Sequence, residues 1–423
     1  MRGPSRRQIL RGALAGGAAL ACGRLARGAA PPAPPHYIVQ FLMLGGYDSV
    51  LCVDPRDPAA TGPGIECGYR NSDLLKGRRR PYGPLFAPLM RHEADLCLVH
   101  GVRSETVNHE DGIHALLRGR TTYSTTTPLL GDALGEVLPG DAPLPYLFLG
   151  PDLADHPARQ GLSSVVHVPL TMIDGLRGAD GPAPAAYASQ PWAAAVADAH
   201  ARDAQRVLAG NAEQAALEAR DARASAVLRR LLATLPARSA FKPKSDQFPE
   251  GPALDLALHA LDQNVAKFIQ IVMPGLDSHI DDLNAQTKRL VPIFEAIATF
   301  LDRLHALRNR FGTLAEQTTI VACSEFGRFP RFNSRAGKDH WPENTWILAG
   351  KGVRRHPDGF TVGGTDERFR GAMVDHETGA INRGDPRPIY LETMGATLLR
   401  LAGGDPRKFG YAADRVLSCA LGA

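Results

Sequence analysis

The chain of 423 residues has 48 basic and 44 acidic side chains, but six of its arginines and no acidic residue lie in residues 1–30. The remainder carries a formal charge of −2, which excludes the broad basic surface of a nucleic-acid-binding protein, so we expect no nucleic-acid partner. Its roughly 390 residues exceed one ordinary hydrophobic core and predict either one large domain with insertions or two domains.

Residues 1–30 have the pattern of an export signal. Arg6 and Arg7 form an arginine pair, and residues 12–22 follow as an apolar stretch that is too short to span a bilayer. Small residues at positions 28–30 complete the pattern of a signal peptide. The arginine pair favours the twin-arginine route over the ordinary secretory route. We therefore expect the twin-arginine export machinery as a partner and a periplasmic or secreted location.

The cysteines leave two questions open. Cys22 ends a weak lipoprotein-like site, and lipid attachment there is the only way in which we expect the protein to reach a membrane. Cys52 and Cys67 could pair in an oxidising compartment. The absence of any Cys-x-x-Cys pair argues against a thiolate zinc site. Between the signal and the folded part, the proline-rich residues 31–36 predict a stiff linker.

Six short apolar runs predict buried strands. They lie at residues 37–44, 96–100, 146–149, 267–273, 318–323 and 345–348. Helical patterns separate them, at residues 193–235, 290–311 and 390–401. This alternation predicts an α/β fold with a doubly wound, mainly parallel sheet in a domain of residues 37–420. Loop and helical insertions are expected near residues 54–82 and 175–252.

Acidic residues and histidines follow four of these runs, at the point where each run ends. They are Asp48, His109, Asp277 with His279, and Glu325 with Asp339 and His340. Ligands of α/β sheets gather at the carboxyl ends of the strands. Carboxylate oxygen and imidazole nitrogen together suit Zn, Mn, Mg or Ca. The set therefore predicts a site for one or two divalent metal ions.

Each of these residues also has an interpretation without metal. Asp48 could be a turn former, and either Asp-His pair could be a polar loop pair. Glu325 could cap the turn that follows it or pair with Arg328. His109 and His114 stand five residues apart and need not share a helix face, so we expect His114 to be structural.

The order of these motifs resembles a known family. The motifs are Gly45-Gly46-Tyr47-Asp48, Asp277-Ser278-His279, Ser324-Glu325-Phe326-Gly327-Arg328 and Asp339-His340. They are similar to those of the secreted bacterial family called domain of unknown function 1501, which belongs to the alkaline phosphatase and sulfatase superfamily. The resemblance covers roughly residues 36–420 and implies an alkaline-phosphatase-like fold with one or two divalent metal ions.

The resemblance also implies roles for individual residues. The implied metal ligands are Asp48, Asp277, His279, Asp339 and His340. Glu325 would be a further ligand or would orient a histidine. Arg328 would hold a substrate anion with two hydrogen bonds.

One position departs from the family pattern. Enzymes of the superfamily attack with a hydroxyl or thiol that follows the second strand, at the start of a helix. The family commonly has Ser-His there, whereas this chain has Asn108-His109. Since Asn108 cannot be a nucleophile, Thr106 or Ser104 is the candidate. His109 would bind metal or steady the leaving group.

The sequence thus predicts an exported, metal-dependent hydrolase of a phosphate or sulfate ester. Its substrate would be an anionic small-molecule or polymer ester, attacked by a metal-bound water or by Thr106. One alternative is a metal-binding but non-catalytic secreted protein that acts through a partner or a cell-surface polymer. Another is a redox-cofactor protein, which would use the same export route but for which the chain has neither a thiolate cluster nor a haem motif.

Overall fold

The computed structural model describes residues 34–124, 127–151, 165–169, 226–228, 230–231, 234–235, 241 and 250–422. From Pro35 onwards the chain forms one compact unit. The predicted export signal with Cys22, most of the linker, and most of the helix at residues 193–235 lie outside the described residues. The same holds for most of the insertion predicted near residues 175–252.

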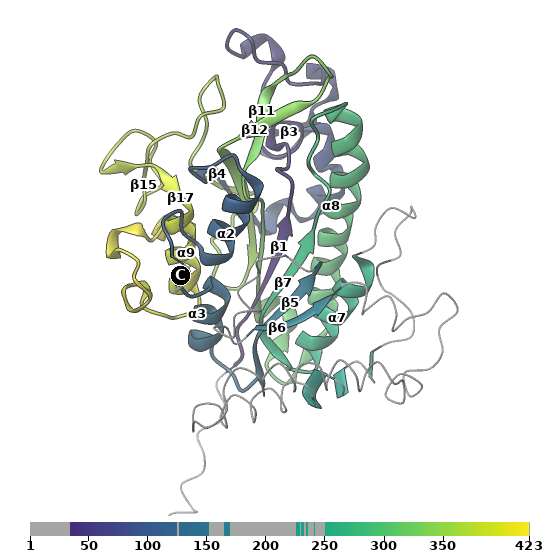
Figure 1. The fold of residues 1–423 in the computed structure, drawn as a ribbon, viewed down its shortest axis with the longest axis vertical. Coiled ribbons are helices and arrows are strands. Elements are labelled where there is room, and N and C mark those ends of the chain that lie inside the picture. The colour runs from purple at the N-terminus through teal and green to yellow at the C-terminus, as the bar shows by residue number, and fades with distance from the viewer. Residues whose placement is uncertain are drawn as a thin grey trace, which may run out of the picture. The chain divides into compact units, whose positions relative to one another are not determined.

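A nine-stranded sheet forms the centre of this unit (Figure 1). Its strands are β1 Tyr37–Met43, β4 Leu96–Arg103, β5 Leu144–Gly150, β6 Val165–Pro169, β7 Ala266–Met273, β10 Thr318–Cys323, β13 Glu343–Gly350, β14 Phe360–Val362 and β17 Ile389–Tyr390. They stand in the order β14-β4-β13-β10-β1-β7-β5-β6, with β17 beside β4. Neighbouring strands are parallel except where β13 pairs with β10 and β4. The predicted mainly parallel sheet is confirmed.

Helices cover both faces of the sheet. They are α2 His109–Arg118, α3 Leu130–Val137, α7 Gly251–Asp262, α8 Asp282–Ala306 and α9 Leu391–Leu401, with a long 3₁₀ segment, η4 Pro84–Asp95. Successive residues of a strand point to opposite faces, so Val39 of β1 belongs to a core shared with α7, α8 and η4. Its neighbour Ile38 belongs to a core shared with α2, α3 and α9. Figure 1 shows these two groups of helices on opposite sides of the sheet, which confirms the doubly wound arrangement.

Helix α8 is longer at its start and shorter at its end than predicted. Its buried apolar residues recur every three or four positions, as a helix that packs on a sheet requires. The helix begins eight residues before this apolar pattern does, with mostly polar residues, and its last residue is Ala306. The chain then turns back as the short antiparallel pair β8 Arg308–Asn309 and β9 Gly312–Thr313. Gly312, at φ 116°, supplies a backbone conformation there that other residues rarely adopt.

Three further antiparallel pairs lie outside the sheet. They are β2 Leu75–Lys76 with β3 Pro81–Tyr82, β11 Gly327–Phe332 with β12 Lys338–Trp341, and β15 Val374–Asp375 with β16 Pro386–Arg387. The pair of β11 and β12 follows β10 and carries several of the residues singled out by the sequence. Residues 54–82, where we predicted an insertion, contain only β2, β3 and short 3₁₀ turns.

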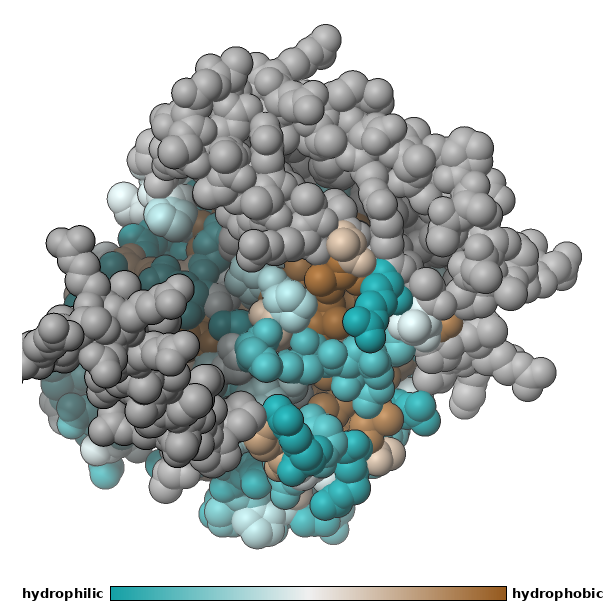
Figure 2. Space-filling view, turned by 90° about the horizontal axis from the view of Figure 1, so that it is seen from below, coloured by the Kyte–Doolittle hydropathy of each residue, from teal (hydrophilic) through white to brown (hydrophobic). Residues whose placement is uncertain are grey.

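On the face that Figure 2 shows, most of the coloured residues are hydrophilic, and a smaller group of hydrophobic ones lies among them. No helix among the described residues has both the length and the apolar character needed to cross a membrane. The five described cysteines are buried and unpaired, so Cys52 and Cys67 are not linked. They are Cys52, Cys67, Cys97, Cys323 and Cys419.

Candidate metal centre

The carboxyl ends of β1, β4, β7 and β10 lie at one edge of the sheet. β1 is parallel to β7 and β10, and β4 has the same direction as β10 because both are antiparallel to β13. The segments that leave these ends carry His109, Asp277 with His279, and Glu325. The hairpin of β11 and β12 adds Asp339 and His340. The edge predicted from the sequence therefore collects these side chains.

The Asp277 carboxylate lies at the centre of the cluster. Its Oδ2 is 3.4 Å from His109 Nε2. Its Oδ1 is 3.2 Å from His279 Nε2 and 3.3 Å from His340 Nε2. The Nε2 atoms of His279 and His340 are 2.9 Å apart. The ligand atoms of His109, Asp277 and His340 all lie within 4.8 Å of one another, and His279 joins this group through its contacts with Asp277 and His340.

The other ring nitrogen of each histidine faces an oxygen that can only accept a hydrogen bond. The three contacts are His109 Nδ1 to Glu325 Oε1 at 2.8 Å, His279 Nδ1 to Asp339 Oδ1 at 3.0 Å, and His340 Nδ1 to the Val107 carbonyl at 2.6 Å. Each Nδ1 therefore carries the hydrogen, and each Nε2 of a neutral ring carries a lone pair. Among the described residues, His109 Nε2 is buried without a hydrogen-bond partner.

This donor set fits a divalent metal ion. Lone pairs that face one another repel unless a proton or a cation lies between them. Ligands at ~2.0–2.1 Å from a tetrahedral zinc ion are about 3.4 Å from each other, close to the four separations of 2.9–3.4 Å given above. Three imidazoles with one carboxylate favour Zn²⁺ or a similar ion over Mg²⁺ and Ca²⁺. The oxygens that hold the three Nδ1 atoms complete the arrangement typical of metal-binding histidines.

The protonation states of Asp277 and His340 suit metal binding, whereas the raised pKa of His109 favours the protonated ring, which does not bind metal. Burial raises the pKa of Asp277, but the hydrogen bond and charge of Arg328 outweigh burial and lower it to about 2. Burial lowers the pKa of His340, whereas the hydrogen bond to Glu325 raises the pKa of His109. At neutral pH, Asp277 is therefore ionised and His340 neutral, which are the forms that bind metal.

Arg328 holds the Asp277 carboxylate in place. Its side chain is fully buried, and Nη2 donates to Asp277 Oδ1 at 2.6 Å. Its other hydrogen bonds go to the backbone carbonyls of Gly45, Gly46, Leu276 and Lys338. Protein groups therefore engage its donors, so the geometry gives Arg328 a positioning role where the resemblance implied that it holds a substrate anion.

Gly45 allows the segment after β1 to approach the segment after β7. Its φ is 113°, in a region that favours glycine. A Cβ at this position would lie 2.4 Å from the backbone nitrogen of Asp277. The Gly-Gly motif singled out by the sequence is thus a packing requirement of the site.

Asp48 has other partners than the cluster. Its carboxylate pairs with Lys338 Nζ, and its Oδ1 accepts a hydrogen bond from Val50 N–H at 2.9 Å. Asp282, 3.9 Å from Lys338 Nζ, completes a buried network of three charged groups. Burial is the main cause that raises the pKa of Asp282 to about 7, and the negative charge of Asp48 adds to it. Sequence reasoning missed Lys338, because a lysine beside a polar Asp-His pair has the pattern of an exposed residue.

Thr106 and its neighbours form the loop that leads into α2. The Ser104 hydroxyl donates to the carbonyls of Thr106 at 2.9 Å and of Pro342 at 3.0 Å. Thr106 Oγ1 accepts from Asn108 N–H at 3.1 Å. Asn108 Oδ1 in turn accepts from Asp111 N–H at 3.1 Å, so Asn108 caps the helix that begins at His109. His114, on the same helix, has its ring against Tyr123.

Glu325 is the residue that orients His109. It is fully buried, and besides His109 it accepts from Gly45 N–H at 2.8 Å and from the Ser324 hydroxyl at 2.8 Å. Glu325→Gln keeps the shape of the side chain but removes the charge that holds the His109 tautomer. We expect metal affinity to fall about 10–100-fold, measured by competition with a chelator of known affinity.

The control for this variant is Glu110→Gln. Glu110 is exposed in the first turn of α2, next to His109 in sequence, and its substitution removes the same charge. The metal affinity of Glu110→Gln should equal that of the unsubstituted protein. An unchanged affinity in Glu325→Gln would show that the contact with His109 does not support metal binding.

Comparison with known proteins gave one family match and several distant structures. A family model described as a protein of unknown function, DUF1501, matches residues 38–415. The search of curated proteins found no match.

Three of the similar solved structures are bacterial. The lipoteichoic acid synthase LtaP from Listeria monocytogenes is 8% identical, with a TM-score of 0.43 and coverage of 91% of this chain and 76% of that one. A protein in the alkaline phosphatase superfamily from Vibrio parahaemolyticus is 10% identical, with a TM-score of 0.38 and coverage of 92% and 70%. The C-terminal periplasmic domain of EcEptC from Escherichia coli is 10% identical, with a TM-score of 0.40 and coverage of 92% and 90%. Similarity at this level assigns no activity to this chain.

Proposed function

Since the chain belongs to the DUF1501 family, we propose that it is an exported, metal-dependent hydrolase of a phosphate or sulfate ester. The observation that carries this proposal is the convergence of three histidine Nε2 atoms on the Asp277 carboxylate. The proposed substrate is an anionic ester, small or polymeric. The proposed location is the periplasm or the exterior, reached through the twin-arginine machinery by residues 1–30, with membrane attachment only if Cys22 is lipidated.

His109, Asp277, His279 and His340 would hold one divalent ion. When bound, such an ion supplies Lewis-acid stabilisation of negative charge on a phosphoryl or sulfuryl oxygen and activates water. The chain itself fixes the ligands: Glu325 and Asp339 orient two of the rings. We propose one ion rather than two, because Lys338 and Val50 already engage the Asp48 carboxylate.

Thr106 is the proposed nucleophile. It lies three residues before His109, at the same edge of the sheet. Its hydroxyl accepts a hydrogen bond from Asn108 N–H, and no acceptor for the hydroxyl hydrogen is found among the described residues. Ser104, by contrast, donates its hydroxyl hydrogen to backbone carbonyls. Thr106 is therefore the hydroxyl of this loop whose hydrogen is not held by a backbone carbonyl. On attack its proton would pass to solvent water, and water itself is the alternative attacking group.

The test is turnover of 4-nitrophenyl phosphate and 4-nitrophenyl sulfate by the full chain loaded with Zn²⁺ or Mn²⁺. We expect one ester class to be hydrolysed, Thr106→Val to lower kcat by about 100-fold or more at unchanged metal content, and Thr106→Ser to retain activity. Thr287→Val, on the exposed face of α8, is the matched control. Full activity in Thr106→Val would assign the attack to water. No turnover by fully metallated protein would overturn the hydrolase proposal.

A second candidate is a metal-binding, non-catalytic secreted protein. It is favoured by Asn108, whose side chain serves as a helix cap at the position where the family commonly has serine. The same experiment separates the two, since this candidate requires bound metal without ester turnover.

A further inference from the structure

A second group of metal-ligating side chains lies at the opposite edge of the sheet. His92 and Asp95 end η4, immediately before β4, and His305 lies in the last turn of α8. The eight residues of β4 separate Asp95 from the loop that leads to His109. At about 3.3 Å per residue this is roughly 25 Å, so the group is distinct from the candidate metal centre.

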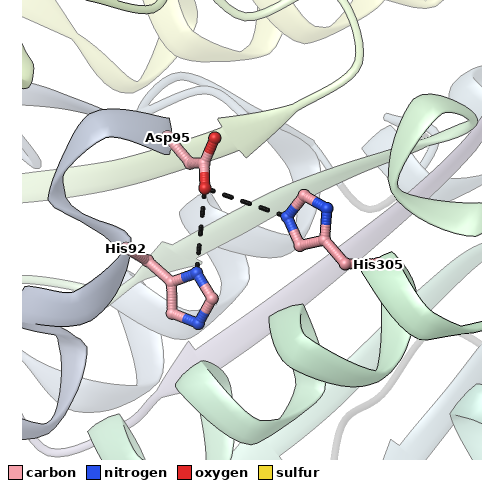
Figure 3. Close-up of side chains that lie close together, drawn as sticks. All are labelled: His92, Asp95 and His305. Carbon is pink, nitrogen blue, oxygen red and sulfur yellow. Dashed lines mark ion pairs between the residues drawn. The ribbon is translucent and has the colours of Figure 1, made fainter. Parts of the chain in front are cut away.

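The two imidazoles point at the same oxygen of Asp95 (Figure 3). His92 Nδ1 is 3.7 Å and His305 Nε2 is 3.8 Å from Asp95 Oδ2. All three atoms lie within 4.8 Å of one another. These separations exceed the N···O distance of a hydrogen bond, roughly 2.7–3.2 Å. They are closer to the about 3.4 Å between two ligands of a tetrahedral ion.

The hydrogen-bond partners of His92 direct a lone pair into this gap. Its Nε2 donates to the Ala298 carbonyl at 3.1 Å and lies 3.0 Å from Asp302 Oδ1. Both oxygens only accept, so Nε2 carries a hydrogen, and a neutral ring presents its Nδ1 lone pair to the Asp95 carboxylate. The protonated ring instead donates to Asp95, and this hydrogen bond is the main cause that lowers the pKa of Asp95. His92 is buried, so a neutral ring meets the carboxylate with little screening by water. A cation between His92 Nδ1 and the Asp95 carboxylate would relieve this repulsion. The hydrogen bond that His92 Nε2 donates is also typical of metal-binding histidines, whose second ring nitrogen is held by an acceptor.

The surroundings leave one carboxylate oxygen free for a cation. Arg355 Nη1 is 3.6 Å from Asp95 Oδ1, which leaves Oδ2 to the two histidines. His92 and Asp95 are three residues apart in a 3₁₀ helix, whose three residues per turn place them on one side. The C-terminal end of α8, which carries His305, also favours a positive charge.

We propose that His92, Asp95 and His305 bind a divalent ion of borderline character such as Zn²⁺. The ion ties η4 to the C-terminal end of α8, two elements that already pack through Phe86 and Phe294. His305 is 48% exposed, so solvent can complete the coordination. The three ligands come together only in the folded chain, so the ion binds that state alone. Binding therefore raises the unfolding temperature.

The test uses the full chain in a background that lacks the candidate metal centre, Asp277→Ala/His340→Ala, so its outcome does not depend on the proposed function. After removal of metal with a chelator, Zn²⁺ binding is measured by equilibrium dialysis and the unfolding temperature is followed by circular dichroism. We expect one bound equivalent and a higher unfolding temperature with Zn²⁺. Adding His305→Ala should remove both effects, and so should adding Asp95→Asn, which preserves the side-chain shape.

The matched control is His356→Ala. His356 is partly exposed and lies 3.7 Å from the Asp358 carboxylate, without a second histidine among its ion-pair partners in the described part of the chain. This variant should bind Zn²⁺ as the background does. If His305→Ala and Asp95→Asn both keep the Zn²⁺ affinity and the temperature shift of the background, the proposal is wrong.

Discussion

Asp277→Asn is expected to abolish ester turnover and to release the metal ion from the candidate metal centre. Both oxygens of Asp277 face histidine Nε2 atoms. Asparagine keeps only one of these acceptor oxygens and loses the negative charge. It also leaves the buried Arg328 guanidinium without its carboxylate partner. We expect kcat/KM to fall at least about 1000-fold, which corresponds to ~4 kcal/mol of lost transition-state stabilisation. Elemental analysis and kinetics on the same preparation measure the two effects.

Asp281→Asn is the control for this substitution. Asp281 is an exposed carboxylate four residues further along the same segment, and its positive φ of 48° suits asparagine. It removes the same charge and should leave metal content and activity unchanged. Wild-type metal content and activity in Asp277→Asn would overturn its assignment as the central ligand.

Lys338→Met is expected to lower the free energy of unfolding by about 3–5 kcal/mol. Methionine fills nearly the same volume, so the loss is electrostatic: Asp48 stays fully buried without a countercharge. The loss should be larger at pH 8 than at pH 5. The pKa of Asp282 is already raised to about 7, and without the lysine the folded state binds still more protons than the unfolded state, so its stability rises as pH falls. Urea unfolding at the two pH values measures this difference.

Two further variants test the cause of this destabilisation. Lys338→Met/Asp48→Asn removes both charges of the pair and should recover most of the loss, since an unpaired buried charge costs more than an absent pair. Lys288→Met, at an exposed position of α8, should change stability little. A loss within ~0.5 kcal/mol in Lys338→Met would show that the buried pair does not stabilise the fold.

The strands were predictable because their environment is uniform. A strand buried on both faces is a continuous apolar run, and each of the six predicted runs became a strand of the sheet: β1, β4, β5, β7, β10 and β13. The short edge strands β6, β14 and β17 were missed, since a few residues at an edge carry little pattern. The antiparallel direction of β13 was not foreseen either, because the composition of a run does not encode its direction.

The candidate site was predictable where topology alone brings residues together. His109, Asp277 and Glu325 gather because each follows a parallel strand at the same edge. The partners of Asp48 and Arg328 could not be foreseen. Asp48 pairs with Lys338, 290 positions away, and Arg328 bonds to backbone carbonyls that only the folded loops bring within reach. Such pairings depend on three-dimensional packing, of which local spacing gives no sign.

The five buried thiols bear on the compartment in which the chain can reach its native state. None of them is paired, so the described residues need no oxidant to fold and can do so in a reducing cytoplasm. Burial raises the pKa of Cys323 to about 12 and that of Cys419 to about 11, which keeps both as unreactive thiols. A protein of this kind can fold first, cross the inner membrane as folded cargo of the proposed twin-arginine route, and enter an oxidising space with these thiols unchanged.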